Sequence, residues 1–456
     1  MPFKRVSIVM LAMVMIYSLV ACSGSNSDGK ESAAPTESTA ENTETATESA
    51  PPETEAEPEP ITLKINLDWN DEDFERVWKK PVEDKFPYIT LEKIPASETN
   101  IEEQVAQGNI PDIIQAQNHE HVSFLEQRGL TMDMTELMNK YQFDINRLQP
   151  GLIARAKNFG KGTIPTLPFE RGVHAMYYNK DIFDKFAVDY PTDDMTWSQV
   201  IELSKQVTGT IGDIQYRGLD LDVPNMAFSQ LNTNYADPET GEPLYTKEPA
   251  FVKYYDMLHE VWSIPGNLYG EDPGALIQSF GGKFIVDQNV AMLPIWNITS
   301  ALATAEEQTG MQWDMVTYPV WDDLIGVDPM AQGPVIGVSA ATKYPDDAFK
   351  VIAYILSDEY QAMRSREGKP SVLVSEEVNS QFAADIPALA DKNLAAFFKH
   401  SPAPGPQSYH EFEHIVENTS WNMMKDFARM KADTNTHLRN VQEAAEERVE
   451  NERQMK

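Results

Sequence analysis

From Ile61 onward, segments with the pattern of β-strands alternate with segments with the pattern of α-helices. ITLKINLDW (61–69) reads as a strand, a helix is expected around 74–86, and YITLEKIP (88–95) and DIIQA (112–116) read as further strands. Strands separated by helices are typical of an α/β fold, and they predict a mainly parallel sheet.

The same alternation continues toward the C-terminus. The expected strands are VHAMYYN (173–179), NVAMLPIWNIT (289–299), WDMVTYPV (313–320) and QGPVIGVSA (332–340). The expected helices are TWSQVIELSKQVT (196–208), AFVKYYDMLHEVW (250–262), one long helix over 346–368, and the tail from Tyr409. Thr196 and Gln199 have the spacing of a capping box at the start of the first of these helices.

Polar residues follow two of the expected strands. Ligands of parallel sheets bind beyond the carboxyl ends of the strands. These ends are Trp69, Asn70 and Asp71 after the first strand, and Gln117, Asn118 and His119 after DIIQA.

The N-terminus has the pattern of a secretory signal. Lys4 and Arg5 precede the apolar run VSIVMLAMVMIYSLVA, which ends at Cys22, the only cysteine in the chain. LVAC (19–22) resembles the lipobox of bacterial lipoproteins, in which the cysteine becomes the lipid-bearing first residue. A reactive thiol and an intermolecular disulfide are the alternatives for Cys22.

Residues 23–60 form an acidic tract that contains no Leu, Ile, Val, Met or aromatic residue. Such a segment cannot bury enough apolar surface to offset the entropy of ordering, so we expect a disordered tether. The folded part is therefore expected to start near Ile61.

The charge of the chain restricts its partners. The sequence has 37 basic and 71 acidic residues, a net charge of −34 at pH 7. Nucleic acids and anionic membrane surfaces are poor partners for such a protein. The acidic surface is explained equally by solubility and by docking to a basic partner.

Short patterns that could indicate metal sites carry little weight. HEFEH (410–414) has the spacing of an inverzincin zinc site, but only a helical tail follows to supply the third ligand. HEH (119–121) is expected to be a polar loop. Tyr177-Tyr178 and Tyr254-Tyr255 could bind iron, but neighbours on a strand point to opposite faces. We therefore assign no metal ligand.

Catalytic motifs are absent from the sequence: there is no G-x-S-x-G, P-loop or G-x-G-x-x-G. A glycoside hydrolase needs two carboxylates across a cleft, and the many acidic residues neither reveal nor exclude such a pair. A secreted glycosidase thus stays as the enzymatic alternative, while no catalytic residue is assigned.

Aromatic residues near strand ends give a stronger indication. Trp69, Phe169 and Trp296 lie at or near such ends, beside Asn, Asp, Glu or Arg. A sugar offers apolar faces on which rings stack and a rim of hydroxyls that polar side chains bind. Each tryptophan alone is equally well a core residue, but the three together favour a carbohydrate ligand.

Five sequence markers occur in the order found in a known family. They are IPDIIQA (110–116), LPFERGVHAMYYNKDIFDKF with the helix start TWSQ (167–199), GGKFIVDQNVAMLPIWN (281–297), WDMVTYPV (313–320) and GVSAATKYPDDAFKVIAYILSDE (337–359). Over residues 61–368 the chain resembles extracellular solute-binding proteins of family 1. These are carbohydrate-binding lipoproteins of ABC importers, related to the maltodextrin-binding protein. Pro294-Ile295 depart from the family's small residues, and its aromatic residue near Gln117 is absent.

This resemblance implies a two-lobe, periplasmic-binding-protein-like α/β fold of type II, with a hinge and a ligand cleft between discontinuous lobes. Residues 1–22 would be the signal peptide and 23–60 the linker. Lobe 1 would comprise 61–169 and 332–358, and lobe 2 would comprise 170–331 and 359–456.

It also implies binding rather than catalysis. The protein would capture a carbohydrate, expected to be an oligosaccharide, and deliver it to the transmembrane subunits of an ABC permease. It would be a monomer without a cofactor, anchored by lipid on Cys22 to the outer face of the cytoplasmic membrane. A glycosidase and a binder of a non-sugar solute such as iron remain alternatives. The expected ligand-binding residues are Trp69, Asn70, Asp71, Gln117, Asn118, His119, Phe169, Glu170, Arg171, Trp296, Asn297 and Gln332.

Overall fold

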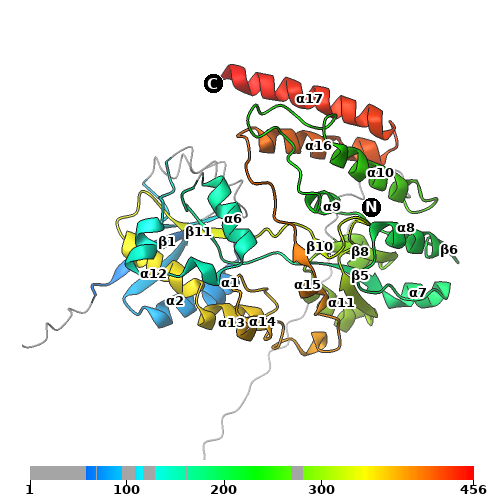
Figure 1. Ribbon diagram of the computed structural model, residues 1–456. Coiled ribbons are helices and arrows are strands. Elements are labelled where there is room, and N and C mark those ends of the chain that lie inside the picture. Colours follow the sequence, from blue (N-terminus) through cyan, green and yellow to red (C-terminus); the bar gives the residue numbers. More distant parts are fainter. Residues whose placement is uncertain are drawn as a thin grey trace, which may run out of the picture. The chain divides into compact units, whose positions relative to one another are not determined.

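The structure is a computed structural model. It describes residues 58–67, 69–94, 108–116, 129–160, 162–268 and 281–455, within the compact unit Pro58–Lys456. The signal segment, Cys22, the acidic tract and the expected strand end Gln117-Asn118-His119 lie outside these ranges. Two five-stranded sheets organise the described part, and helices cover them (Figure 1).

The first sheet has the strand order β2-β1-β3-β11-β4. Its strands are β1 (Ile61–Asn66), β2 (Ile89–Ile94), β3 (Ile113–Ala116), β4 (Leu167–Pro168) and β11 (Val335–Val338). Around it lie α1 (Asp71–Asp73), η1 (Phe74–Lys79), α2 (Lys80–Lys85), α5 (Thr135–Lys140), η3 (Ile145–Arg147), α6 (Pro150–Phe159), α12 (Pro345–Ile355), α13 (Asp358–Arg366) and α14 (Glu376–Asn379). One hydrophobic core joins these elements, which we call the first lobe.

The second sheet has the order β6-β7-β8-β5-β9. Its strands are β5 (His174–Asn179), β6 (Gly209–Ile211), β7 (Ile214–Leu219), β8 (Val290–Trp296) and β9 (Trp313–Thr317). With it lie α7 (Lys180–Phe186), α8 (Trp197–Gln206), α9 (Asn225–Ser229), α10 (Pro249–Ser263), η5 (Lys283–Asp287), α11 (Thr299–Thr309), η6 (Pro387–Leu389), α15 (Ala396–Lys399), α16 (Glu413–Ala428) and α17 (Thr434–Met455). These elements form the second lobe. A small sheet pairs β10 (Val327–Asp328) with β12 (Ser401–Pro402).

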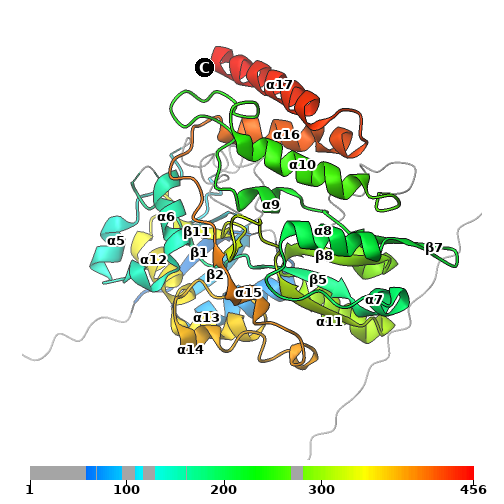
Figure 2. The ribbon, with the colours of Figure 1, turned by 45° about the vertical axis from the view of Figure 1, so that its right-hand side comes forward.

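Both faces of the second sheet are buried. Alternate side chains of β5 enter different cores, Tyr178 on one face and Tyr177 on the opposite face. The first of these cores extends to Tyr254 and Tyr255 of α10 and to α16 and α17, which pack beside α10 (Figure 2). All four tyrosines considered as iron ligands are therefore core residues. None of the helices in the described ranges is long and apolar enough to cross a membrane.

The capping box at the start of α8 is confirmed, because the Thr196 side chain accepts the Gln199 amide and Gln199 bonds back. The prediction of a mainly parallel sheet is wrong. β1 pairs in parallel with β2 and β3, and β7 with β8, but β11 and β5 are antiparallel to both of their neighbours. These two strands begin just after the chain has passed from one lobe to the other. A local helical crossover, which forces a parallel arrangement, therefore does not set their direction.

The long helix expected over 346–368 is also wrong, because α12 ends at Ile355 and α13 begins at Asp358. Ser357 has an extended conformation (ψ 160°), and its hydroxyl accepts the amide of Tyr360. Serine in this position starts a new helix and interrupts the previous one.

The described chain changes between lobes three times. It leaves the first core after Phe169 and enters the second lobe at Val173, and it returns through residues 328–334. Val378 still belongs to the first core and Phe382 to the second lobe, so the third crossing lies between them. The boundary placed at Asp358 from the sequence does not coincide with this change, because Tyr360 of α13 packs in the first core.

Candidate functional site

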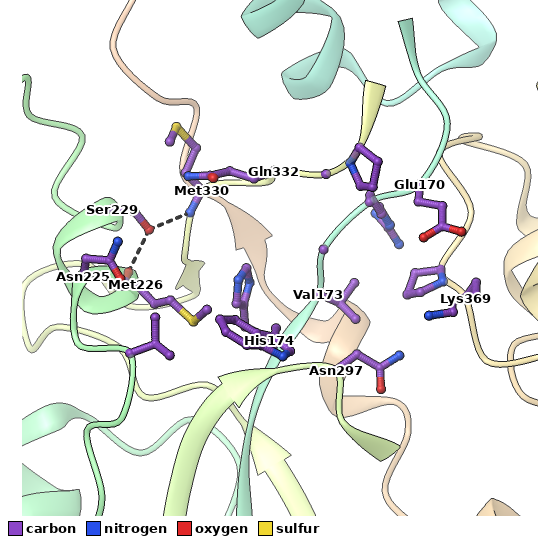
Figure 3. Close-up of a pocket in the computed structure, with 17 residues that line it drawn as sticks. Glu170, Val173, His174, Asn225, Met226, Ser229, Asn297, Met330, Gln332 and Lys369 are labelled. Carbon is purple, nitrogen blue, oxygen red and sulfur yellow. Dashed lines mark hydrogen bonds between the residues drawn. The ribbon is translucent and has the colours of Figure 1, made fainter. Parts of the chain in front are cut away.

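A cavity of about 560 Å³ lies where the first two crossings meet the ends of β8 and α13 (Figure 3). This volume is in the range of small-molecule binding sites. Its walls are residues 170–174, Val223 with Asn225, Met226 and Ser229 of α9, Trp296 and Asn297, Met330 with residues 332–334, and Lys369 with Pro370. Both lobes thus contribute to one cavity.

The backbones of the first and second crossings are in direct contact beside this cavity. The Gly172 amide donates to the Gln332 carbonyl over 2.5 Å. A Cβ added at Gly333 would lie 2.2 Å from the Glu170 carbonyl oxygen, so only glycine fits there. This contact holds Glu170, Arg171 and Gln332 at one wall.

Trp296 is held by hydrogen bonds around its own backbone. The Tyr177 hydroxyl donates to the Trp296 carbonyl (3.3 Å) and accepts the amide of Ile298 (3.1 Å). The Asn297 amide group donates to the carbonyl of Gly368 (2.9 Å), and its oxygen accepts from Thr299. Asn297 therefore links the strand end in the second lobe to the end of α13 in the first.

Glu170 is neutralised by Arg364. The guanidinium of Arg364 is 5 % exposed and lies 2.8 Å from the Glu170 carboxylate and 2.6 Å from that of Glu367. The same guanidinium lies 5.9 Å from the ring of Trp69. Glu170 is the one carboxylate among the described residues that line the cavity, so these residues do not supply the pair that glycoside hydrolysis requires.

The polar wall formed by α9 and β5 was not predicted from the sequence. Asn225 Oδ1 is buried and has no hydrogen-bond partner within the described ranges, while Ser229 Oγ accepts the Met330 amide over 3.1 Å. Figure 3 shows both side chains beside Met226 at the same end of the cavity. His174 lies deeper, and burial lowers its pKa to about 4, so its imidazole is neutral at pH 7. A short helix after a loop carries no pattern that would have singled out Asn225.

The structure brings together Glu170, Arg171, Trp296, Asn297 and Gln332 of the expected ligand-binding residues.

Four other expected residues lie elsewhere in the first lobe. Phe169 is 3 % exposed, with its ring 5.2 Å from that of Trp78, and Trp69 lies 5.9 Å from the same ring. The Asn70 side chain accepts the amide of Asp73 at the start of α1, and Asp71 is exposed and pairs with Lys93.

No group of three or more His, Cys, Asp or Glu side chains in the described ranges is placed to hold a metal ion. In HEFEH, His410 precedes α16, which begins at Glu413, so the two histidines do not share one helix. The Glu413 carboxylate accepts the amides of Tyr235 and Ala236.

A second cavity, of about 320 Å³, is also lined by residues 171–174 and contains a histidine with acidic partners. His400 Nδ1 lies 3.3 Å from Asp328 and Nε2 lies 2.8 Å from Asp194. The hydrogen bond to Asp328 is the main cause that raises the pKa of His400. Burial raises the pKa of Asp328, whereas Lys399 and His400 lower that of Asp194.

Folding stability is expected to fall as the pH rises above 6.5. Histidines in the unfolded chain titrate near 6.5, and the raised pKa means that folded His400 holds its proton more tightly. The contribution of protonated His400 to the free energy of unfolding is therefore complete below pH 6.5, and it is lost as the pH rises through the folded-state pKa. Urea unfolding at pH 6, 7 and 8 measures the decline, which His400→Gln should remove. An unchanged decline in that variant would contradict the assignment.

Two other histidines make the folding stability depend on pH in the opposite sense below pH 6.5. Burial lowers the pKa of His174 and His437 to about 4, so the unfolded chain binds protons that the folded protein does not. Stability should therefore also fall as the pH drops from 6.5 toward 4, in the wild type and in His400→Gln alike.

The sequence of the chain matches one protein family. Residues 85–390 match the family described as bacterial extracellular solute-binding protein. Curated relatives include the sn-glycerol-3-phosphate-binding periplasmic protein UgpB of Brucella abortus (31 % identical over 81 residues) and of Rhizobium meliloti (27 % over 99 residues). These alignments cover 17 % and 21 % of this chain and 18 % and 23 % of the relatives, so the chain spans about a fifth of their length.

Solved structures resemble the chain over most of its length. A sugar transporter of Rhizobium etli in an open conformation has a TM-score of 0.69 at 19 % identity, covering 85 % of this chain and 99 % of that one. An ABC substrate-binding protein of Listeria monocytogenes in complex with cycloalternan has a TM-score of 0.67 at 17 % identity, covering 86 % of this chain and 99 % of that one. The sugar-binding protein MalE of Xanthomonas citri has a TM-score of 0.67 at 15 % identity, covering 87 % of this chain and 99 % of that one. The expected two-lobe α/β fold is confirmed.

Proposed function

Since this chain belongs to the bacterial extracellular solute-binding proteins, we propose that it captures a carbohydrate, specifically an oligosaccharide, in the cavity between its lobes. In this proposal the protein is the substrate-binding component of an ABC importer and delivers the bound sugar to the permease. Binding needs no covalent step and no cofactor.

The observation that carries the proposal is the pairing of Trp296 with polar groups across the cavity. A ring fixed at a strand end offers a flat face to the C–H surface of a sugar. Asn225 Oδ1 is a buried acceptor without a partner among the described residues, and an unmade hydrogen bond of this kind costs about 1–3 kcal/mol. A sugar hydroxyl would satisfy it.

The names of similar proteins support the same class of ligand. The Listeria protein was solved with cycloalternan, and the Rhizobium and Xanthomonas proteins are described as a sugar transporter and a sugar-binding protein. The UgpB relatives are described as binding sn-glycerol 3-phosphate, a phosphorylated polyol.

We further propose that Cys22 carries a lipid and that the tract 23–60 tethers the folded part to the outer face of the cytoplasmic membrane. As a flexible coil this tract would span on the order of 35 Å. The charged segment, apolar run and LVAC sequence support this anchor, which mass spectrometry of membrane-extracted protein would test directly.

A thermal-shift screen of residues 23–456 against mono- and oligosaccharides tests the binding function, with Fe(III), Zn(II) and amino acids as controls. A ligand at a hundred times its dissociation constant should stabilise the protein by about 2.7 kcal/mol. Intact sugar recovered afterwards would support a binding protein, whereas cleavage products would support the glycosidase. A shift with metal alone would overturn the carbohydrate proposal.

A further inference from the structure

The charges around the main cavity differ in sign from the charge of the protein. The chain carries −34, yet the charged residues that line the cavity are one acid, Glu170, and two bases, Arg171 and Lys369. The Arg364 guanidinium forms an ion pair with the Glu170 carboxylate at 2.8 Å. The two bases are therefore left to determine the local charge.

Neither base forms a salt bridge with a described residue, although the buried carboxylate of Asp328 acts on Arg171 from a longer distance. Lys369 forms no ion pair with a described residue, whereas other lysines such as Lys140 and Lys350 pair with acids at 2.5 and 2.9 Å. Arg171 Nε is buried without a hydrogen-bond partner in the described ranges, and the guanidinium lies 5.3 Å from the Phe398 ring. Burial lowers the pKa of Arg171 to about 10, although Asp328 opposes this.

The position of Lys369 is set by the residues around it. Gly368, with φ +81°, ends the helical region, and its carbonyl accepts from Asn297. Pro370 follows and also lines the cavity. Figure 3 shows Lys369 on the side of Glu170 and Asn297, away from Asn225 and Ser229. The cation Lys369 and the uncharged polar groups Asn225 and Ser229 thus lie at different ends of the cavity.

We infer that the ligand is an acidic saccharide, whose carboxylate or phosphate group is bound by Lys369 and Arg171. Its uncharged hydroxyls face Asn225 and Ser229, and a sugar ring lies against Trp296. Hydrogen bonds from a cation to an anion are about twice as strong as neutral ones, and a guanidinium fits carboxylate and phosphate equally well. This inference rests on the proposed carbohydrate-binding function, because it names the class of saccharide for the same cavity.

Isothermal titration calorimetry of residues 23–456 tests it with a panel of uronate oligosaccharides and sugar phosphates, each beside its neutral counterpart. The acidic member of at least one pair should bind at least tenfold more tightly, and NaCl should weaken that binding. Lys369→Gln should weaken binding of the acidic ligand about tenfold and binding of its neutral counterpart much less. Lys343→Gln removes the same charge at an exposed site outside the lining and should change neither.

The outcomes separate the two proposals. Equal affinity for acidic and neutral members, with no effect of salt or of Lys369→Gln, would overturn the acidic ligand and leave carbohydrate binding intact. Binding of neither kind would overturn carbohydrate binding itself. Preference for uronates or for sugar phosphates would each support the inference and identify the source of the charge.

Discussion

Replacing Arg364 with methionine is expected to lower the free energy of unfolding by about 3–5 kcal/mol, the usual cost of removing one partner of a buried ion pair. Methionine keeps much of the packing, but it leaves the Glu170 carboxylate, 18 % exposed, without its partner at 2.8 Å. Glu367 loses its bond to the same guanidinium. Urea denaturation followed by tryptophan fluorescence measures the change.

Two further variants make this prediction specific. Arg366→Met removes an exposed arginine from the same helix, which pairs with Asp385 at the surface, so its effect should be within the error of the measurement. Adding Glu170→Gln to Arg364→Met should recover part of the lost stability, because the unpaired carboxylate is then gone. Equal effects of Arg364→Met and Arg366→Met would show that burial does not decide the strength of these pairs.

Truncating Trp296 to alanine should weaken ligand binding by about 2 kcal/mol or more, roughly thirtyfold in the dissociation constant. Trp296 lines the cavity, and the Tyr177 hydroxyl donates a hydrogen bond to its backbone carbonyl. Trp296→Phe keeps a smaller face and should lose less affinity. Calorimetry with the sugar found in the thermal-shift screen measures both.

Trp69→Ala is the matched comparison. Trp69 also stands at a strand end in the sequence, but its ring packs 5.9 Å from Trp78 and is not among the residues that line the cavity. We expect this variant to lose stability while the folded protein keeps its affinity. A larger loss of affinity from Trp69→Ala than from Trp296→Ala would place the ligand in a different part of the molecule.

Local patterns were sufficient for much of the fold. The capping box at Thr196, the strand VHAMYYN and the helix AFVKYYDMLHEVW depend on residues close together in the chain, so the sequence predicts them directly. The order of five such sequence markers was enough to predict the family of solute-binding proteins.

The sequence also predicted part of the cavity wall. Glu170, Arg171 and Gln332 lie at the crossings that the resemblance implied, and Trp296 and Asn297 lie at the strand end that the pattern indicated. Their role in ligand binding stays a prediction.

Only the tertiary structure decided which strand ends reach the cavity. Trp69 and Trp296 look alike in sequence, but one packs on a neighbouring tryptophan and the other lines the opening between the lobes. The antiparallel entry of β5 and β11 and the places of Asn225 and Lys369 have the same origin. Each depends on segments far apart in the chain that meet only after folding, and no periodicity within one segment records such a contact.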